Sequence, residues 1–321
     1  MRSTASRPSW PAVTTDDPTL PDDPRLGRTA LHVADLDDVA EFYRDVVGLE
    51  VLARNGDAAT HGAGGTALLE LEATPEAGDR HRSAAGLFHD AFRVPDRAAL
   101  GDALKRVRER WRLDGASDHG VSEALYLSDP EGNGVEMYRD RPREQWPSGD
   151  DSRVAMITEP LDLEAVAAAG ASTSSPPPSA APPGTDLRHG HLEVTSLSAF
   201  EGFYVEGVGF EPQATMSSAR FVGAGGYHHH VGANVSNGRS ASAAGHGLAW
   251  FEVVLPREIG DDMAAVGWPR TRVVRGRPPR GGGPGVGPVA AGRPRPPVSG
   301  TDEGFEATDP DGIRVRFRAA D

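Results

Sequence analysis

Residues 117–138 read Ser-Asp-His-Gly-Val-Ser-Glu-Ala-Leu-Tyr-Leu-Ser-Asp-Pro-Glu-Gly-Asn-Gly-Val-Glu-Met-Tyr, and this stretch decides the fold. Two segments typical of strands, residues 125–128 and 134–139, flank the run 129–134, which is dense in turn-forming residues. Asp, Pro, Gly and Asn in such a run favour a reversal of the chain. The stretch therefore predicts a β-hairpin.

Three chemically active side chains lie on or beside this hairpin: His119, Tyr126 and Glu136. Because a hairpin brings the ends of its two strands together, we expect the three to lie near one another. An imidazole, a phenol and a carboxylate that converge on a sheet surface form a candidate metal and acid/base site. The spacing alone is equally compatible with a solvated hairpin whose His and Glu face water.

The composition indicates an acidic protein with two domains. The chain has 321 residues, enough for two domains with cores of their own, and a formal net charge of −14. Lys105 is its only lysine, and it has no cysteine. Such a composition is typical of halophilic proteins, whose surface carboxylates keep them soluble at high salt. The lack of cysteine excludes disulfides, thiolate metal sites and a cysteine nucleophile.

The same composition narrows the partners that we expect. The negative charge disfavours binding to nucleic acid, because the well-patterned regions carry no basic patch with interleaved aromatic residues. No apolar run approaches the length of a membrane span, and residues 1–24 contain no signal-peptide pattern. We therefore expect a cytoplasmic protein that binds neither membrane nor nucleic acid.

The chain from residue 25 follows a repeated order of elements, after a Pro- and Ser-rich stretch, residues 1–24, that predicts a disordered tail. A strand near residues 29–34 precedes a helix that we expect to begin after Asp35 and to end at Gly48. Three short strands follow it. A second strand and helix, near residues 87–94 and 97–111, lead into the hairpin. The pattern predicts two βαβββ units in residues 25–147.

A second copy of this region is visible by comparing the chain with itself. Leu36, Phe42-Tyr43 and the Gly-Ala-Gly-Gly of residues 62–65 recur 161 residues later, with Ser196 in the place of Asp35. Asp129-Pro130 recurs as Asp309-Pro310, where the offset has grown to 180. The sequence thus predicts a first domain at 25–147, a Ser/Pro-rich linker at 148–186 and a second domain at 187–321.

The longer offset comes from an aberrant segment, residues 264–300, which contains no acidic residue and is dominated by Arg, Pro and Gly. Its counterpart in the first copy is the helix near 97–111, which such a sequence cannot form. The segment is either a disordered basic insertion or a stretch translated from a shifted reading frame. We favour the shifted frame, because acidity and pattern return together at Thr301. Either way, the fourth unit is expected to be degenerate.

Four such units, the Asp-Leu-x(5)-Phe-Tyr helices and the Gly-Gly-Tyr-His-His-His-Val-Gly of residues 225–232 resemble the vicinal oxygen chelate superfamily. That superfamily contains glyoxalases, bleomycin-resistance proteins and extradiol dioxygenases, and the similarity is greatest to two-domain catechol 2,3-dioxygenase-like proteins. The resemblance implies an α+β fold in which paired units enclose a cup for a divalent metal. It places that cup in the first domain.

The extradiol signature within this resemblance is met by His119, Leu125, Tyr126, the Asp-Pro-Glu-Gly of residues 129–132, and Glu136. The resemblance implies that Glu136 is a metal ligand, that His119 is an acid/base group and that Tyr126 binds a substrate hydroxyl. It makes His89 a second ligand. Two histidines and one carboxylate suit non-haem Fe(II), and Mn(II) suits the same ligands.

The family's first histidine ligand should stand at position 30, which is an alanine. His32, on the same face of the predicted strand, is a weaker substitute.

The second copy has His191 at the position equivalent to Ala30, but Trp250 and Arg316 replace the other two ligands. His228 and His230, which we expect on one face of a strand, could form an incomplete second site with His191. The alternative is a polar lining of a substrate cup or of a domain interface.

The function that this resemblance implies is extradiol cleavage of a small catechol-like aromatic by O₂ at Fe(II) or Mn(II). Two alternatives stay open: a glyoxalase-type isomerase or lyase that uses Zn(II) or Ni(II), and a non-catalytic resistance-type protein that binds a small molecule. Assembly into a homo-oligomer is compatible with all three.

Overall fold

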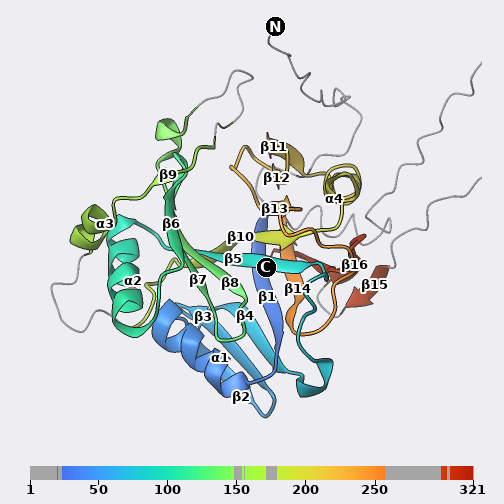
Figure 1. Cartoon of the computed structure of the whole chain (residues 1–321), viewed down its shortest axis with the longest axis horizontal. Coiled ribbons are helices and arrows are strands. Elements are labelled where there is room, and N and C mark those ends of the chain that lie inside the picture. The colour runs from blue at the N-terminus through green and yellow to red at the C-terminus, as the bar shows by residue number, and fades with distance from the viewer. Residues whose placement is uncertain are drawn as a thin grey trace, which may run out of the picture.

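The computed structural model describes residues 20, 24–147, 154, 156–170, 179–256, 298–301 and 304–320 (Figure 1). Most of the predicted tail at 1–24 and nearly all of the segment 264–300 lie outside these residues. Parts of the linker at 148–186 lie outside them too. The region in which we expect the fourth helix to be lost is also not among the described residues.

The first unit forms as the sequence predicts. Its elements are β1 (Arg25–Val33), α1 (Leu36–Phe42), a π-helical turn η1 (Tyr43–Val47), β2 (Glu50–Asn55), β3 (Ala58–Ala63) and β4 (Thr66–Ala73). The Asp35 side chain accepts hydrogen bonds from the backbone N–H groups of Asp37 and Asp38, which caps α1. Gly48 ends the helical segment with a positive φ of 90°, a conformation that glycine adopts at little cost.

The second unit contains the predicted hairpin. A 3₁₀ turn, η2 (Pro75–Ala77), leads to β5 (Gly86–Arg93), α2 (Arg97–Arg110), β6 (Gly115–Asp118), β7 (Ser122–Ser128), β8 (Gly134–Asp140) and the 3₁₀ turn η3 (Arg143–Gln145). Strands β7 and β8 are antiparallel over their full length, with Tyr126 opposite Glu136. The hairpin prediction is confirmed.

The second copy repeats the order. The linker supplies β9 (Glu159–Pro160) and α3 (Leu163–Ala169). The third unit is β10 (Asp186–Glu193), α4 (Leu197–Tyr204), β11 (Glu211–Thr215), β12 (Ala219–Gly223) and β13 (Val231–Asn234). The described strands of the fourth are β14 (Gly247–Leu255), β15 (Val298–Thr301), β16 (Gly304–Thr308) and β17 (Arg314–Ala319). The predicted α+β fold of four related units is confirmed.

The pairing of the units differs from the expectation. Strand β5 of the second unit pairs with β10 of the third, and β1 of the first pairs with β14 of the fourth. The result is one nine-stranded and one eight-stranded sheet, each shared by both copies. The expectation that the first copy closes a cup by itself is therefore wrong. The repeat defines the units, but it does not determine which edges of those units meet.

Alternation along the strands separates a core from a functional face. Leu125, Leu127 and Val135 join the large apolar cluster that includes the inner side of α2. Tyr126 and Glu136, at the alternate positions, point to the opposite side of the nine-stranded sheet. No helix in the described part of the chain is long and apolar enough to cross a membrane.

Candidate metal centre

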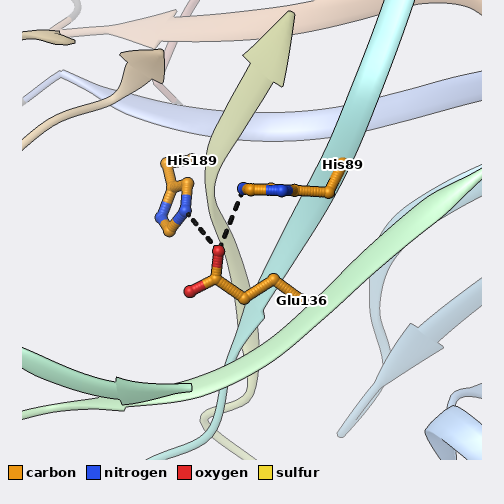
Figure 2. A group of neighbouring side chains, drawn as sticks. All are labelled: His89, Glu136 and His189. Atoms are coloured by element: carbon orange, nitrogen blue, oxygen red, sulfur yellow. Dashed lines mark hydrogen bonds and ion pairs between the residues drawn. The ribbon is translucent and has the colours of Figure 1, made fainter. Parts of the chain in front are cut away.

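Two histidines and a glutamate meet on this opposite side of the nine-stranded sheet, which we call the metal face. His89 comes from β5, Glu136 from β8 and His189 from β10, and their polar ends point toward one another (Figure 2). Glu136 Oε2 lies 3.0 Å from His89 Nε2 and 3.2 Å from His189 Nε2. Within the described ranges, these three form the only group of His, Asp and Glu side chains close enough to bind one metal ion.

The register of three adjacent strands brings the group together. Ala91 in the central strand β5 is paired with Glu136 on one side and with His189 on the other. His89 lies two residues before Ala91, so its side chain is on the same face. Since Ala91 has only a methyl group, space remains above it for the three longer side chains. The small residue at 91 is thus part of the site.

The electrostatics favour the protonation states that metal ligands need. Burial opposes ionisation of Glu136, which is 3% exposed, but the adjacent imidazoles of His189 and His89 hold its pKa well below the ordinary value. Burial lowers the pKa of His189. An ionised carboxylate beside an unprotonated imidazole is the state that binds a metal.

The polar atoms of the group also fit a cation. His89 Nε2 is buried and, although close to Glu136, has no hydrogen-bond partner of acceptable geometry among the described residues. A buried polar atom without a partner is unusual and calls for one. Two imidazoles and one carboxylate on one side of an ion match the ligand set of non-haem Fe(II), and Mn(II) accepts the same donors. The residues present therefore fit a divalent metal.

The candidate ligand that stands in for the histidine missing at position 30 is His189, which was not among the residues predicted from the sequence. It comes from β10 of the other copy, so it could be found only by knowing that β5 pairs with β10. The available signal was the pattern His189-Gly190-His191, which places two imidazoles on one face of a strand. His32 is on β1 in the other sheet, 3.5 Å from Glu72 and away from the group.

The structure brings His119 and Tyr126 together beside the group. His119 Nε2 lies 2.7 Å from the Tyr126 hydroxyl, and His119 Nδ1 lies 2.9 Å from the carbonyl oxygen of Ile157. Because a carbonyl can only accept, Nδ1 carries the proton; the Nε2 of the neutral ring then accepts from Tyr126. The Tyr126 ring is 5.7 Å from that of His89 between centroids. The predicted convergence of His119, Tyr126 and Glu136 is confirmed.

The predicted strand through His228 and His230 is wrong. These residues lie in the loop that follows the turn at Gly225-Gly226, and β13 begins only at Val231. His228 Nε2 donates to Asp140, and its ring centroid lies 6.0 Å from that of His189, while His230 Nδ1 accepts from the N–H of Ala224. The expected second site of His191, His228 and His230 is not formed.

His191 is on the metal face but makes different contacts. It lies opposite His89 in the strand register, with the two ring centroids 5.1 Å apart. Its Nε2 is 3.2 Å from the side-chain nitrogen of Asn234. His191 therefore lines the site beside the ligand group.

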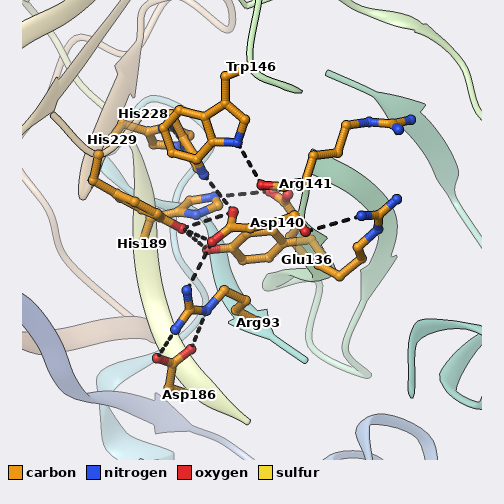
Figure 3. A network of polar contacts seen from close by, with 12 residues as sticks. Arg93, Glu136, Asp140, Arg141, Trp146, Asp186, His189, His228 and His229 are labelled. Carbon is orange, nitrogen blue, oxygen red and sulfur yellow. Dashed lines mark hydrogen bonds and ion pairs between the residues drawn. The ribbon is translucent and has the colours of Figure 1, made fainter. Parts of the chain in front are cut away.

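A charged network around Asp140 lies next to Glu136 and His189 (Figure 3). Asp140 accepts from His228, from the Tyr227 hydroxyl and from Arg93, and Arg93 also forms an ion pair with Asp186. This Asp140 network joins the second unit to the third. It holds the loop that precedes β13 against β8.

Comparison with known proteins finds one family model and several related chains. The model named Glyoxalase/Bleomycin resistance protein/Dioxygenase superfamily matches residues 25–137. A catechol-2,3-dioxygenase of Bacillus subtilis is 38% identical over 254 residues, which span 77% of this chain and 88% of that protein.

Two solved structures share the fold at low sequence identity. One, from Bacillus subtilis, has a TM-score of 0.58 at 10% identity and covers 92% of this chain and 84% of its own. The other, glyoxalase I from Zea mays, has a TM-score of 0.51 at 13% identity and covers 92% of each chain.

Proposed function

The chain belongs to the glyoxalase/bleomycin resistance protein/dioxygenase superfamily, and from this premise we propose that it is an extradiol-type ring-cleaving dioxygenase. Its substrate would be a catechol-like aromatic, and its metal Fe(II) or Mn(II) held by His89, Glu136 and His189. The observation that carries the proposal is the meeting of this group with the His119–Tyr126 pair on one face. The similarity to a catechol-2,3-dioxygenase supports it.

A divalent ion bound there would supply open positions at which a catecholate and O₂ can meet. The protein's own contribution begins with geometry. All three ligands come from adjacent strands of one sheet, so one side of the group is closed by β5, β8 and β10. The side above the sheet is left for substrate, next to Tyr126.

His119 and Tyr126 would handle the proton of a catechol hydroxyl. Since Tyr126 donates its proton toward His119 Nε2, its oxygen can accept a hydrogen bond from the substrate. Burial, aided by the charge of Glu136, raises the pKa of Tyr126, so a free phenolate at this position is disfavoured. We therefore expect the substrate proton to move to Tyr126 as the Tyr126 proton moves to His119. The acid/base function is thus shared by the pair.

The alternative of a glyoxalase-type enzyme gains no specific support. A four-ligand site with Zn(II) or Ni(II) would need a fourth protein side chain, and the group in the described residues has three members.

The proposal is tested by anaerobic reconstitution of the full chain with Fe(II) or Mn(II), followed by catechol and then air. We expect a metal-bound protein that consumes O₂ and forms a yellow ring-cleavage product. Glu136→Gln should lose both metal and activity, whereas Glu72→Gln, a change in the other sheet beside His32, should keep both. A wild-type protein that retains no divalent metal and forms no product would contradict the proposal.

A further inference from the structure

Phe88 is an exposed aromatic residue within an otherwise buried strand. Its exposed fraction is 43%, whereas that of the next residue, His89, is 7%. The other residues of β5 as far as Phe92 are buried. An isolated exposed apolar side chain on a protein surface is ordinary, but this one adjoins a proposed metal ligand. Its surroundings therefore bear on the site.

A β-bulge explains the position of Phe88. In the pairing of β5 with β10, His89 is opposite His191 and Leu87 is opposite Leu192, which leaves Phe88 as an extra residue with no partner. A bulge of this kind redirects a side chain from its regular alternation. The Phe88 ring accordingly lies 5.1 Å from the His191 ring and 5.2 Å from the His89 ring between centroids. Phe88 thus borders the metal face.

The apolar character of this border extends beyond Phe88. Phe221, from β12, also packs edge-on against His191, at 5.4 Å between centroids. Four residues along β5 from His89, Arg93 belongs to the charged Asp140 network. The metal face therefore has a charged end and an aromatic end, which is open to solvent at Phe88, with the ligand group between them.

The equivalent position in the other sheet lacks the aromatic ring. Residue 249, which is 161 positions after Phe88, is an alanine, and the pairing of β14 with β1 has its own irregularity at this point. Both sheets have a bulge at this position, but only the bulge beside the metal group carries a phenyl ring. The bulge itself does not require a phenylalanine, because the equivalent bulge in the other sheet has Ala249 at this position.

On the basis of the proposed function, we propose that Phe88 contacts the substrate and selects catechols that carry an apolar substituent. The catechol oxygens would face the ligand group, and the substituent would extend toward the open end and pack against the Phe88 ring. Covering an exposed phenyl with apolar surface is favourable, whereas an anionic substituent would gain nothing from that contact.

The test measures binding rather than turnover. The full chain is loaded with Zn(II), which does not undergo redox chemistry, and is titrated calorimetrically without O₂ with catechol, 3-phenylcatechol and 3,4-dihydroxybenzoate. We expect 3-phenylcatechol to bind roughly ten-fold more tightly than catechol, as expected for covering part of an aromatic ring. Phe88→Ala should remove most of this ratio, and Phe88→Leu should restore part of it. Leu52→Ala, an exposed apolar residue of β2 in the other sheet, should leave the ratio unchanged.

An equal preference in the wild type and in Phe88→Ala would overturn the assignment of Phe88 while catechol binding itself supports the proposed function. Tighter binding of 3,4-dihydroxybenzoate than of 3-phenylcatechol would also overturn it. A metal-loaded protein that binds none of the three would overturn both proposals.

Discussion

The two sheets are built from the same repeated units, but they carry chemically different side chains at equivalent positions. His189 and His89 in the nine-stranded sheet correspond, at the offset of 161, to Arg28 and Trp250 in the eight-stranded sheet. Glu136 corresponds to Arg316 at the offset of 180. The group in one sheet has two imidazoles around a carboxylate; the other has two guanidinium groups around an indole. We call the latter the arginine face.

The arginine face is filled by its own interactions. The Arg316 guanidinium lies 3.8 Å from the centre of the Trp250 ring, and Arg28 lies 5.7 Å from it. Arg28 also forms ion pairs with Glu70 at 2.8 Å and with Glu252 at 3.0 Å. Fixed positive groups repel a metal cation, so we expect one metal per chain. The comparison teaches that the repeat preserves the strand geometry. The side chains at three equivalent positions then decide whether a face can bind a metal or is filled by its own contacts.

The largest effect that separates the two faces should follow from removing equivalent side chains. His189→Ala deletes a proposed ligand, so we expect dioxygenase activity to fall at least roughly a hundred-fold, the scale on which even less direct metal-site changes act. Arg28→Ala, the matched change on the arginine face, should retain metal and most activity at a temperature where it is folded. The measurement is O₂ uptake with catechol, normalised to folded protein by circular dichroism. Equal losses in the two variants would remove the distinction between the faces.

A smaller effect should follow from Tyr126→Phe, which keeps the ring but removes the hydroxyl hydrogen-bonded to His119. We expect kcat to fall by about 10²-fold, the usual contribution of a positioned acid or base, while the metal content is unchanged. Its counterpart on the other sheet is Glu306, which pairs with Arg316. Glu306→Gln should leave kcat unchanged. A Tyr126→Phe enzyme with full kcat would exclude the shared proton transfer.

The last effect is one of stability and develops only below neutral pH. His61 of the first unit is fully buried, and its counterpart in the third unit is Val222. Burial lowers the pKa of His61 to about 4, below the ordinary 6.5. The unfolded chain therefore binds the proton more readily, so this histidine destabilises the fold increasingly as pH falls from 6.5 to 4.

His61→Val, which makes the two units alike, should remove that penalty. We expect its gain in unfolding free energy to rise by about 3 kcal/mol between pH 7 and pH 4. Urea unfolding at several pH values measures it. A gain that does not change with pH would show that His61 is protonated equally in both states.

Local patterns made much of this fold predictable. The Asp35 cap, the Gly48 stop and the turn at residues 129–134 each rest on a few neighbouring residues, and all three form as predicted. The meeting of His119, Tyr126 and Glu136 was predictable for the same reason, because one hairpin sets it.

The third member of the metal group was not predictable in this way. His189 meets Glu136 only because β5 uses β10, rather than β1, as its neighbour, and edge pairing between distant units leaves no local mark in the sequence. The loop at His228 and His230 was misassigned for a related reason. The repeat predicts a strand at His228 and His230, but the turn at Gly225-Gly226 and the contact of His228 with Asp140 keep these residues outside β13.

The most direct test of the central claim is the metal content of the reconstituted, desalted chain, compared between His189→Ala and His191→Ala. Both residues are on the same face of β10, and only His189 lies within the group that can hold one ion. The account predicts one divalent metal per chain in the wild type and in His191→Ala, and none in His189→Ala. Retention by His189→Ala together with loss from His191→Ala would contradict it, as would two metals per wild-type chain.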